Sequence, residues 1–579
     1  MHSSNLHAPT PASLAASVEV TRRENRLLHA GILLTLALAC AGCLAIDLVD
    51  PDLWGHIRYA EDWLATGELP RTASHTFSAP DHPWINHEIL AELAIAKGYR
   101  HLGINGLLAA KCLLGMAIVG LMVSVARRQG VSLLLTWALM LLVCANLHPF
   151  FVLRPQLMSF GLFGLVLWLL ERGFRNWQIS RSIDWKFLWS LPIVFALWAN
   201  THGAFVLGLA VVGALLGGRI VEKIVEQQAS LRECLLLALT VCGCIAATLL
   251  NPYGIGLHHW LIQSLSRPRP EITEWLSPST ENVVFWPWVA LLVVAVLSIL
   301  MAQRRRDWVK FGILMLVAWQ SALHMRHIAF LALLCGFWLP EYVNSAVTRL
   351  RLERLSSLAS SRYTTIARRA AIVTLLAVAC LLSFRIDRQF HGLPVSRNTY
   401  PLDAVQFMAD RGLQGRLVVS FNWAQYSVAA LAPDVQVAFD GRFRTCYPQD
   451  VIDMNFDFLL GEFGGRRYRC DDSGPLDATR VLRHGTPDLV LLDRRYAHAV
   501  SVMQEQKSCW SLLYRDRVAE IWGRRERYDM PTSSSYMPLA LRVQDPRPRD
   551  GAVLWPALPT REVPGQLAAG AAIQEHLGS

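Results

Sequence analysis

Long apolar segments recur along this chain of 579 residues, and they constrain its fold more than any other feature. A helix needs about 20 consecutive, mainly apolar residues to cross the hydrocarbon core of a bilayer. Only 17% of the residues are charged, whereas soluble domains carry about 25%. Eleven candidate spans lie near residues 28–46, 106–125, 131–147, 156–171, 187–200, 203–218, 233–250, 285–302, 309–323, 327–345 and 370–386. The chain is therefore predicted to be an α-helical polytopic membrane protein.

Clusters of Lys and Arg between these segments predict the orientation, because cytoplasmic loops carry an excess of both residues. The clusters are Arg22/Arg23/Arg26, Arg127/Arg128, Arg172 to Lys186, Arg219 to Arg232, Arg304 to Lys310 and Arg349 to Arg369. With eleven spans and residues 1–27 in the cytoplasm, every cluster lies on the cytoplasmic side. The outer elements are then loop 47–105, a loop near 251–284 and the region after residue 386. This layout predicts a lipid bilayer as partner and no nucleic acid, despite a net charge of +10.

Residues 387–528 are predicted to form a soluble α/β domain on the outer side. RLVVS, VQVAFDGR and PDLVLLDRR have the pattern of strands, YPLDAVQFMADRG that of a helix, and CWSLLYRDRVAEIWGRR that of a hairpin. Asp440 and Arg442 are interpreted as a buried pair that holds a turn, with a ligand-binding crevice as the alternative. Cys446 and Cys470 are candidates for a disulfide. Residues 529–579 are expected to be a Pro-rich, loosely ordered tail.

The first outer loop is strongly acidic. From Asp47 to Glu92, nine acidic residues accompany two basic ones. DPDLWGHIRYAEDWLATG and NHEILAELAIAKGYRHLG have the pattern of surface helices, the first with Trp54, Ile57 and Leu64 on a face predicted to touch lipid. Charged groups next to hydrocarbon are costly and therefore point to a functional site. A solvated acidic loop is the alternative.

A multi-span chain with Asp50-Pro51-Asp52 after its first span resembles the GT-C superfamily of membrane glycosyltransferases, which includes protein O-mannosyltransferases, the lipid A aminoarabinose transferase and oligosaccharyltransferase. The first loop, together with NTHGAF, NPYG, MRHIAF and FDGR, also resembles a group of bacterial membrane proteins described only as GT-C-like. The resemblance implies a GT-C-like domain over residues 28–386 in a bacterial cytoplasmic membrane. It also implies transfer of a sugar from a polyprenyl-phosphate donor to a lipid, glycan or protein acceptor at the outer face.

The resemblance makes Asp50, and next Asp52, the candidate catalytic base. Such a transfer needs a base for the acceptor hydroxyl, and a positive charge or a metal for the departing phosphate. The carboxylates of Asp50 and Asp52 are also suitable ligands for Mg²⁺ or Mn²⁺. Helix capping by Asp50 is the structural alternative. His87 and Glu88 are further catalytic candidates, although Asn86 can cap a helix with Glu88 in its first turn.

Cationic side chains on the outer loops are candidates for substrate binding. Arg154 and Arg326 lie in short outer loops, and the rigid fork of a guanidinium suits phosphate. Snorkelling at the membrane interface is the alternative for both. Lys111 lies inside an apolar segment and needs a partner, such as a loop acid or a lipid phosphate. The remaining candidates are His56, His202, Arg267, Arg269 and His327.

Two other classes of function stay open. A transporter or flippase of a lipid-linked glycan would need charged groups deep inside several spans, whereas only Lys111 is charged near the middle of these segments. A non-enzymatic assembly subunit of the cell envelope would tolerate replacement of Asp50. The sequence favours the glycosyltransferase, although it lacks a second DxD on a later outer loop and a β-trefoil pattern at its C-terminus.

Overall fold

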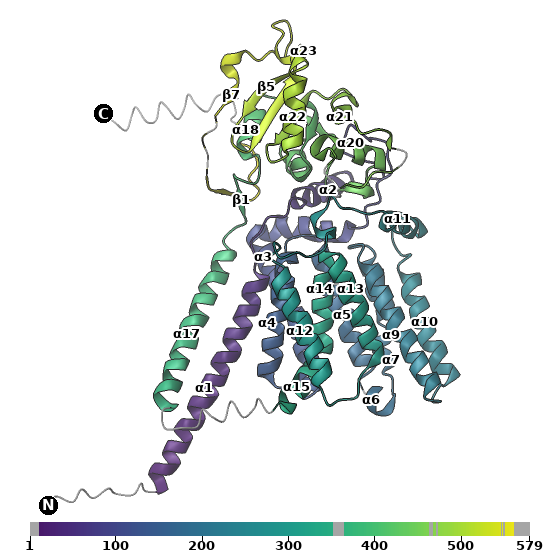
Figure 1. Cartoon of the computed structure of the whole chain (residues 1–579), viewed down its shortest axis with the longest axis vertical. Coiled ribbons are helices and arrows are strands. Elements are labelled where there is room, and N and C mark those ends of the chain that lie inside the picture. Colours follow the sequence, from purple (N-terminus) through teal and green to yellow (C-terminus); the bar gives the residue numbers. More distant parts are fainter. Residues whose placement is uncertain are drawn as a thin grey trace, which may run out of the picture.

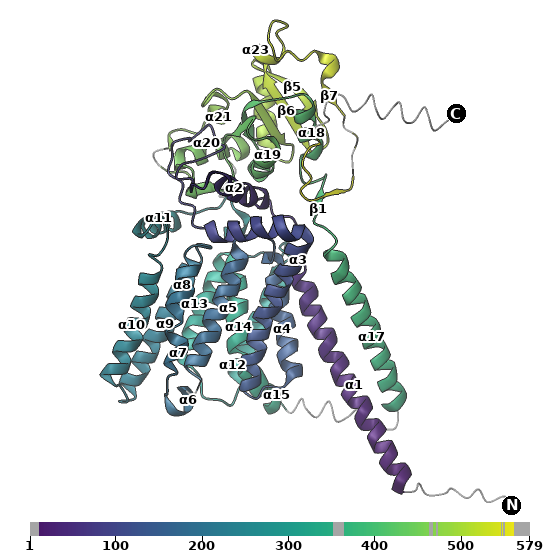
Figure 2. The same cartoon turned by 180° about the vertical axis from the view of Figure 1, so that it is seen from behind.

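A helical bundle stands beneath a mixed α/β domain, with short helices across the boundary between them (Figure 1). The computed structural model describes residues 11–175, 177–350, 364–462, 467–470, 473–545, 547 and 550–560. The N-terminal end of α1 (Pro11–Leu44) and the α/β domain lie at opposite ends of the bundle, as Figures 1 and 2 show from two sides. This arrangement agrees with the prediction that the two lie on opposite sides of a membrane.

Each of the eleven apolar segments contains a helix. Among the described residues, six helices are long and apolar enough to span: Arg22–Leu44 of α1, α3 (Ile89–Arg128), Leu133–Phe150 with α4 (Leu133–Leu147), Gln156–Ser180 with α5 (Gln156–Gly173), α9 (Phe205–Val225) and α17 (Thr364–Gln389). A seventh candidate joins η3 (Met325–His327) and α14 (Ile328–Trp338) to α15 (Pro340–Arg349), with a bend of 61°. Shorter helices are α8 (Leu191–Trp198), α10 (Leu231–Ala247), α12 (Phe285–Met301) and α13 (Trp308–Leu323). The chain is a multi-pass membrane protein, while the count of eleven spans stays a prediction.

Basic clusters that are far apart in the sequence contact one another through shared acidic partners. Arg219 Nη2 lies 2.6 Å from Asp307 Oδ2, and Arg305 Nη2 lies 2.9 Å from Glu226 Oε1. Their segments meet at the end of the bundle away from the α/β domain (Figure 1). The clusters at 219–232 and 304–310 therefore lie on one side, as the distribution of Lys and Arg predicts. The assignment of this side to the cytoplasm stays a prediction.

Two helices of the first outer loop lie across the top of the bundle, where the sequence predicts surface helices (Figure 2). They are α2 (Leu53–Thr66) and the first part of α3, which ends at a kink with Gly103 at φ 66°. Glycine adopts this left-handed conformation at little cost, so the chain can turn there from the surface into the bundle. The acidic loop is therefore a folded element of the boundary.

The prediction that Trp54 and Ile57 of α2 face lipid is wrong. Their side chains are buried in the protein, at only 2% and 6% exposure. The Trp54 ring packs 4.9 Å from Tyr426 and 4.4 Å from Trp555, both in the α/β domain. Its indole nitrogen donates a hydrogen bond to the Pro556 carbonyl at 2.9 Å. The α/β domain therefore covers this face of α2. Packing the aromatic rings against one another removes their large apolar surfaces from water, which stabilises the contact.

Replacement of Trp54 by Ala is expected to lower the stability of the folded protein by about 3–5 kcal/mol, since it leaves a cavity among aromatic rings. Thermal unfolding of the purified protein in detergent measures the effect. Leu64→Ala is the control on the same helix, because Leu64 is 43% exposed. Equal melting temperatures for the two variants would contradict the buried position of Trp54.

The α/β domain contains a six-stranded sheet of order β3-β2-β4-β6-β5-β7. The strands are β2 (Gly415–Val419), β3 (Val435–Val437), β4 (Leu489–Asp493), β5 (Trp510–Arg515), β6 (Ala519–Arg524) and β7 (Val543–Gln544). β2 is parallel to β3 and β4, with Leu417 opposite Val437 and Leu489. β5 and β6 form the predicted hairpin. Helices α18 (Leu402–Asp410) and α19 (Ala424–Leu431) share the core of one sheet face, and α20 (Gln449–Leu460) and α22 (Ala497–Glu505) that of the other.

Residues 529–560 differ from the expected loose tail. β7 lies in the main sheet, and β8 (Ala552–Leu554) pairs antiparallel with β1 (Pro394–Ser396). Trp555 then anchors the segment on α2, at 7% exposure. Buried contacts of a few residues order this segment despite its Pro-rich composition. Residues 561–579 lie outside the described residues.

The predicted buried pair of Asp440 and Arg442 is confirmed. Arg442 Nη2 lies 2.7 Å from Asp440 Oδ2, and the guanidinium stacks 4.6 Å from the Tyr59 ring of α2. Burial raises the pKa of Asp440, but the charge of Arg442 outweighs it and holds that pKa below its usual value. The pair therefore fastens the α/β domain to the first outer loop. Cys446 and Cys470, the predicted disulfide partners, are free thiols in the structure.

Candidate functional site

A cavity of about 1080 Å³ lies between the bundle and the α/β domain. Its walls come from the α1–α2 connection, the loops before α3, α5 and α9, η3, the second outer loop and the sheet of the α/β domain. It is lined by ten of the predicted site residues, namely Asp50, Asp52, His56, His87, Glu88, Arg154, His202, Arg269, Arg326 and His327. The structure thus brings together side chains from six separate loops, while their roles stay predictions.

Arg154 is bracketed by three carboxylates on one side of the cavity. Its Nε lies 3.2 Å from Asp50 Oδ2, its Nη2 2.8 Å from Asp52 Oδ2 and its Nη1 3.0 Å from Glu274 Oε1. Burial raises the pKa of Asp50 to about 7, although the charge of Arg154 partly opposes this. Asp50 therefore exchanges protons near neutral pH, as a catalytic base does.

Helix capping, the structural alternative for Asp50, is not what the structure shows, because Asp52 is the N-cap residue of α2 and Asp50 only holds the turn before it. Asp50 Oδ1 accepts a hydrogen bond from the backbone N–H of Asp52 at 2.9 Å, just before α2 begins. Only one of the two carboxylate oxygens serves this turn, because Oδ2 faces Arg154. A structural role at Oδ1 and a chemical role at Oδ2 are therefore compatible.

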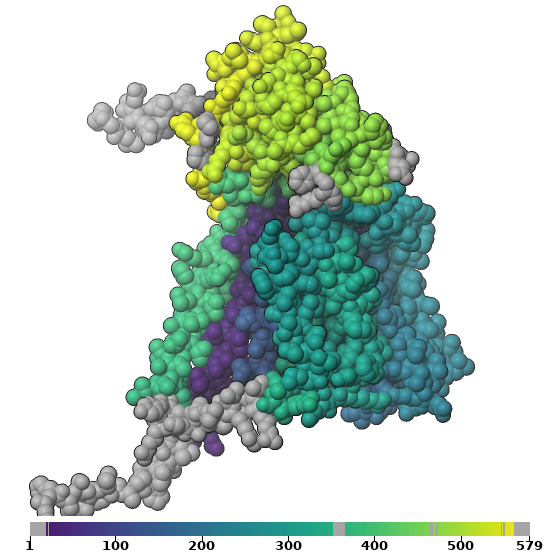
Figure 3. Space-filling model, viewed as in Figure 1, coloured from purple at the N-terminus to yellow at the C-terminus, as the bar shows by residue number. Residues whose placement is uncertain are grey.

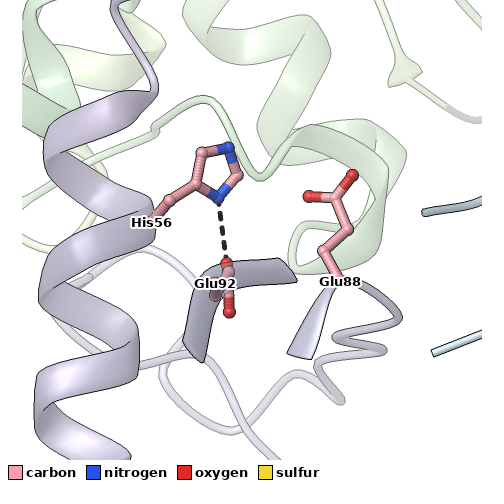
Figure 4. A group of neighbouring side chains, drawn as sticks. All are labelled: His56, Glu88 and Glu92. Atoms are coloured by element: carbon pink, nitrogen blue, oxygen red, sulfur yellow. Dashed lines mark hydrogen bonds and ion pairs between the residues drawn. The ribbon is translucent and has the colours of Figure 1, made fainter. Parts of the chain in front are cut away.

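His56, Glu88 and Glu92 form a second polar group, shown in Figure 4. His56 Nδ1 lies 3.0 Å from Glu92 Oε1, and Asn86 Nδ2 donates to Glu92 Oε2 at 2.6 Å. Burial alone would lower the pKa of His56, but the hydrogen bond with Glu92 and the charge of Glu88 raise it to about 9. His56 is therefore a cation at neutral pH, and Glu92 orients it.

Two sets of carboxylates were candidates for a metal. Asp50 and Asp52, the predicted ligands of Mg²⁺ or Mn²⁺, both contact the Arg154 guanidinium, whose charge takes the place of an ion. His56, Glu88 and Glu92 offer ligand atoms within 4.8 Å of one another, but the cationic His56 would have to lose its proton first. Asp50 and Asp52 are thus engaged by Arg154, whereas the His56, Glu88 and Glu92 group has the spacing of a metal site, and metal dependence stays a prediction.

His202 is held as a neutral donor beside Glu88. The backbone N–H of Ala204 donates to His202 Nδ1 at 3.2 Å, so the ring proton is on Nε2, which lies 3.8 Å from Glu88 Oε1. Ser159 Oγ lies 2.8 Å from Nδ1. Burial, followed by the charge of Arg326, holds the pKa of His202 well below its usual value. His87 Nε2 approaches the same Glu88 oxygen at 4.0 Å.

Two arginines flank Trp275 on the cavity wall. The guanidinium carbons of Arg326 and Arg269 lie 4.6 and 4.7 Å from the Trp275 ring centroid. Neither arginine forms an ion pair with a carboxylate of the described residues, in contrast to Arg154. Burial and the charge of Arg444 lower the pKa of Arg269 to about 9, which leaves it charged at neutral pH. The pair presents two positive charges at the cavity wall, and its role in phosphate binding stays a prediction.

Lys111 is the predicted site residue that the structure places elsewhere. It is 3% exposed, does not line the cavity, and donates a hydrogen bond to the Ile46 carbonyl just after α1. The predicted partner was a loop acid or a lipid phosphate. The charge of Asp47, an acid of the first outer loop, acts on the ammonium, and the carbonyl freed at the end of α1 accepts its hydrogen bond. Arg267, from the second outer loop, does not line the cavity either.

Several residues of the cavity were not singled out from the sequence. Glu92 follows Glu88 by four positions, which places both on one helical face, so its role could have been inferred. Glu274, Gln425 and Tyr496 gave no such signal, because they come from distant segments. Gly441 brings the α/β domain against Asp52: a Cβ at this position would lie 2.0 Å from Asp52 Oδ1.

The fold is similar to crystal structures of ArnT from Cupriavidus metallidurans. The structure bound to undecaprenyl phosphate has 14% sequence identity and a TM-score of 0.49, over 88% of this chain and 98% of that chain. The apo structure has 14% identity and a TM-score of 0.47, over 90% of this chain and 100% of that chain. No protein-family model and no curated protein sequence matches the chain.

Proposed function

We propose that this protein is a GT-C-type glycosyltransferase, which moves a sugar from a polyprenyl-phosphate donor to an acceptor hydroxyl at the outer face of a bacterial cytoplasmic membrane. One observation carries the proposal: a single cavity at the top of the bundle contains Asp50, with a pKa of about 7, and the cations Arg269 and Arg326, which have no carboxylate partner among the described residues. A base and a phosphate-stabilising charge are the two requirements of this transfer. The sequence resemblance of the first outer loop supports the same reaction.

In the proposed reaction, Asp50 accepts the proton of the acceptor hydroxyl. The acceptor oxygen then bonds to the anomeric carbon of the sugar, and the bond from that carbon to the phosphate oxygen breaks. The phosphate leaves with the bonding electrons, and Arg269 and Arg326 stabilise its added negative charge. Asp52 and Glu274 hold the Arg154 fork, which keeps the Asp50 carboxylate in place.

The cavity also has an apolar part that suits a lipid chain. Val206, Leu207 and Ala210 of α9 line it, together with Leu261 and Leu265 of α11 (Ile255–Leu265). A polyprenyl donor has a phosphate next to a long hydrocarbon chain, so it needs such an apolar wall beside a cationic site. The arrangement therefore supports a lipid-linked donor over a water-soluble one.

The first test uses the full chain in lipid nanodiscs with radiolabelled polyprenyl-phosphate sugars and a cell-envelope extract. The proposal expects label to appear in the extract and free polyprenyl phosphate to accumulate. Passage of the intact donor across a vesicle membrane, without cleavage, would favour a flippase instead. The absence of both sugar transfer and donor cleavage with every donor would contradict the proposed reaction.

The pH dependence of the rate follows from Asp50. Since only the carboxylate form accepts a proton, kcat/KM is expected to rise about tenfold per pH unit below pH 7 and to level off above it. Initial rates over this range, with elution of the folded protein checked at each pH, measure the profile. A rate that is flat or that falls between about pH 5.5 and 7 would contradict Asp50 as the base.

A further inference from the structure

The carboxyl ends of two parallel strands of the α/β domain open into the cavity. β2 ends at Val419 and β4 at Asp493, and the chain enters a loop after each strand. Both loops lie in the cavity wall, with the lining residues Phe421, Asn422, Arg495, Tyr496, Ala497 and His498. The sheet therefore contributes a wall of its own, opposite the helical bundle.

The two loops diverge toward opposite faces of the sheet. β2 lies between β3 and β4, and the chain leaves it for α19, which packs with Leu417 and Val419. The chain leaves β4 for α22, which packs with Val490 and Leu492 on the other face. Adjacent parallel strands whose connections leave to opposite faces enclose a crevice, and open α/β sheets bind ligands there.

Buried polar atoms in this crevice have no partner. Gln425 of α19 is 3% exposed and lines the cavity; its Oε1 lies against Gly55 of α2 and accepts no hydrogen bond from the described residues. His498 Nε2 is buried and unpartnered in the same part of the chain. A buried polar atom without a partner costs folding free energy, so a ligand that donates and accepts hydrogen bonds there is favoured.

The cations near the crevice are already neutralised. Arg495 Nη2 lies 2.6 Å from Asp493 Oδ2, and Arg494 Nε lies 3.4 Å from Glu520 Oε1. The Asn422 amide and the Tyr496 hydroxyl line the cavity with no hydrogen bond among the described residues, and the partly buried Phe421 ring, packed on Phe439 and Phe456, presents its remaining surface beside them. Amides, hydroxyls and an aromatic ring suit a neutral ligand with many hydroxyls.

We propose that this switch-point crevice, formed by Phe421, Asn422, Gln425, Tyr496 and His498, binds the neutral glycan part of the acceptor. The acceptor role rests on the proposed glycosyltransferase function. Gln425 connects the crevice to the reacting groups, because a Cβ on Gly441 would lie 2.6 Å from Gln425 Nε2 and 2.0 Å from Asp52 Oδ1. The acceptor then enters from the α/β domain, and the donor phosphate from the bundle.

The test measures two ligands separately on the full chain in nanodiscs. N,N′-diacetylchitobiose and maltose are the neutral glycan probes, and their binding is measured by saturation-transfer NMR. Undecaprenyl phosphate is the donor-side probe. Asn422→Ala and Tyr496→Phe are each expected to weaken glycan binding by about 3- to 10-fold, the effect of one lost hydrogen bond. Tyr536→Phe is the matched control, because Tyr536 is 41% exposed and does not line the cavity. Arg326→Gln is expected to leave glycan binding unchanged.

The outcomes separate the two proposals. Loss of glycan binding in both crevice variants, with undecaprenyl phosphate bound as by the wild type, supports the crevice. Absence of binding for both glycans, or equal binding by all variants, overturns it even if undecaprenyl phosphate binds. If the glycans bind as expected but undecaprenyl phosphate does not, the crevice is supported and the donor assignment of the proposed function fails.

Discussion

Asp50→Asn is expected to lower the rate of sugar transfer by about 10²- to 10⁴-fold, the range for loss of a general base, and Asp52→Asn is expected to lower it by a smaller factor. Asp50→Asn removes the group with a pKa near 7, and Asp52→Asn removes a charge that holds Arg154 at 2.8 Å. Both replacements keep the shape of the side chain but remove a charge that pairs with Arg154, so elution of each variant as a folded species is checked first. The measurement is transfer of label from a polyprenyl-phosphate sugar to envelope extract under single-turnover conditions.

Asp81→Asn is the matched control for these two variants. Asp81 lies in the same outer loop, is exposed, and does not line the cavity. Its replacement is expected to leave the transfer rate unchanged. Wild-type rates in both Asp50→Asn and Asp52→Asn, with all proteins eluting as folded species, would show that the two carboxylates only shape the start of α2.

Arg326→Gln is expected to weaken binding of undecaprenyl phosphate by about 10- to 100-fold, because it removes a charge-assisted hydrogen bond to phosphate. Arg326 stacks on Trp275 and has no carboxylate partner within the described residues, so its charge is free for a ligand. Arg326→Lys keeps the charge but loses the planar fork, and an intermediate affinity is expected. Binding in nanodiscs and kcat/KM for the donor are the two measurements.

Arg305→Gln provides the comparison for Arg326. Arg305 lies at the other end of the bundle, where it pairs with Glu226, and its side chain is 66% exposed. Donor affinity is expected to be unchanged in this variant. If Arg326→Gln binds undecaprenyl phosphate as tightly as Arg305→Gln does, the phosphate is held elsewhere in the cavity.

The sequence predicted most of the fold, because hydrophobic length and Lys/Arg position are properties of local segments. The same holds for the hairpin of β5 and β6 and for the turn held by Asp440 and Arg442. The lipid-facing side of α2 was predicted wrongly, since an amphipathic pattern shows that Trp54 is buried but not what buries it. The strands of residues 529–560 were not predicted. They have only two or three residues each, which is too short for an alternating pattern of apolar residues to be recognised.

The residues of the candidate site were predictable where a charge or imidazole stood on an outer loop. Asp50, Arg154 and Arg326 stand out in this way, and the structure places them around one cavity. Lys111 lies outside the cavity, although it was a candidate for substrate binding. A charge inside an apolar segment predicts that a partner is present, but it does not predict which group is that partner. Gln425 has a common side chain on a helix of the distant α/β domain, so only the folded structure reveals that it lies beside Asp52.

The contact of Gly441 with Asp52 has a consequence for the order of synthesis. The first outer loop leaves the ribosome long before the strands that complete the cavity, and domains fold as they emerge. A nascent chain therefore carries its carboxylates at the membrane surface without the wall that encloses them. In the proposed reaction, the Asp50 base and its donor therefore share an enclosed cavity only after the last third of the chain has been synthesised and has packed over α2.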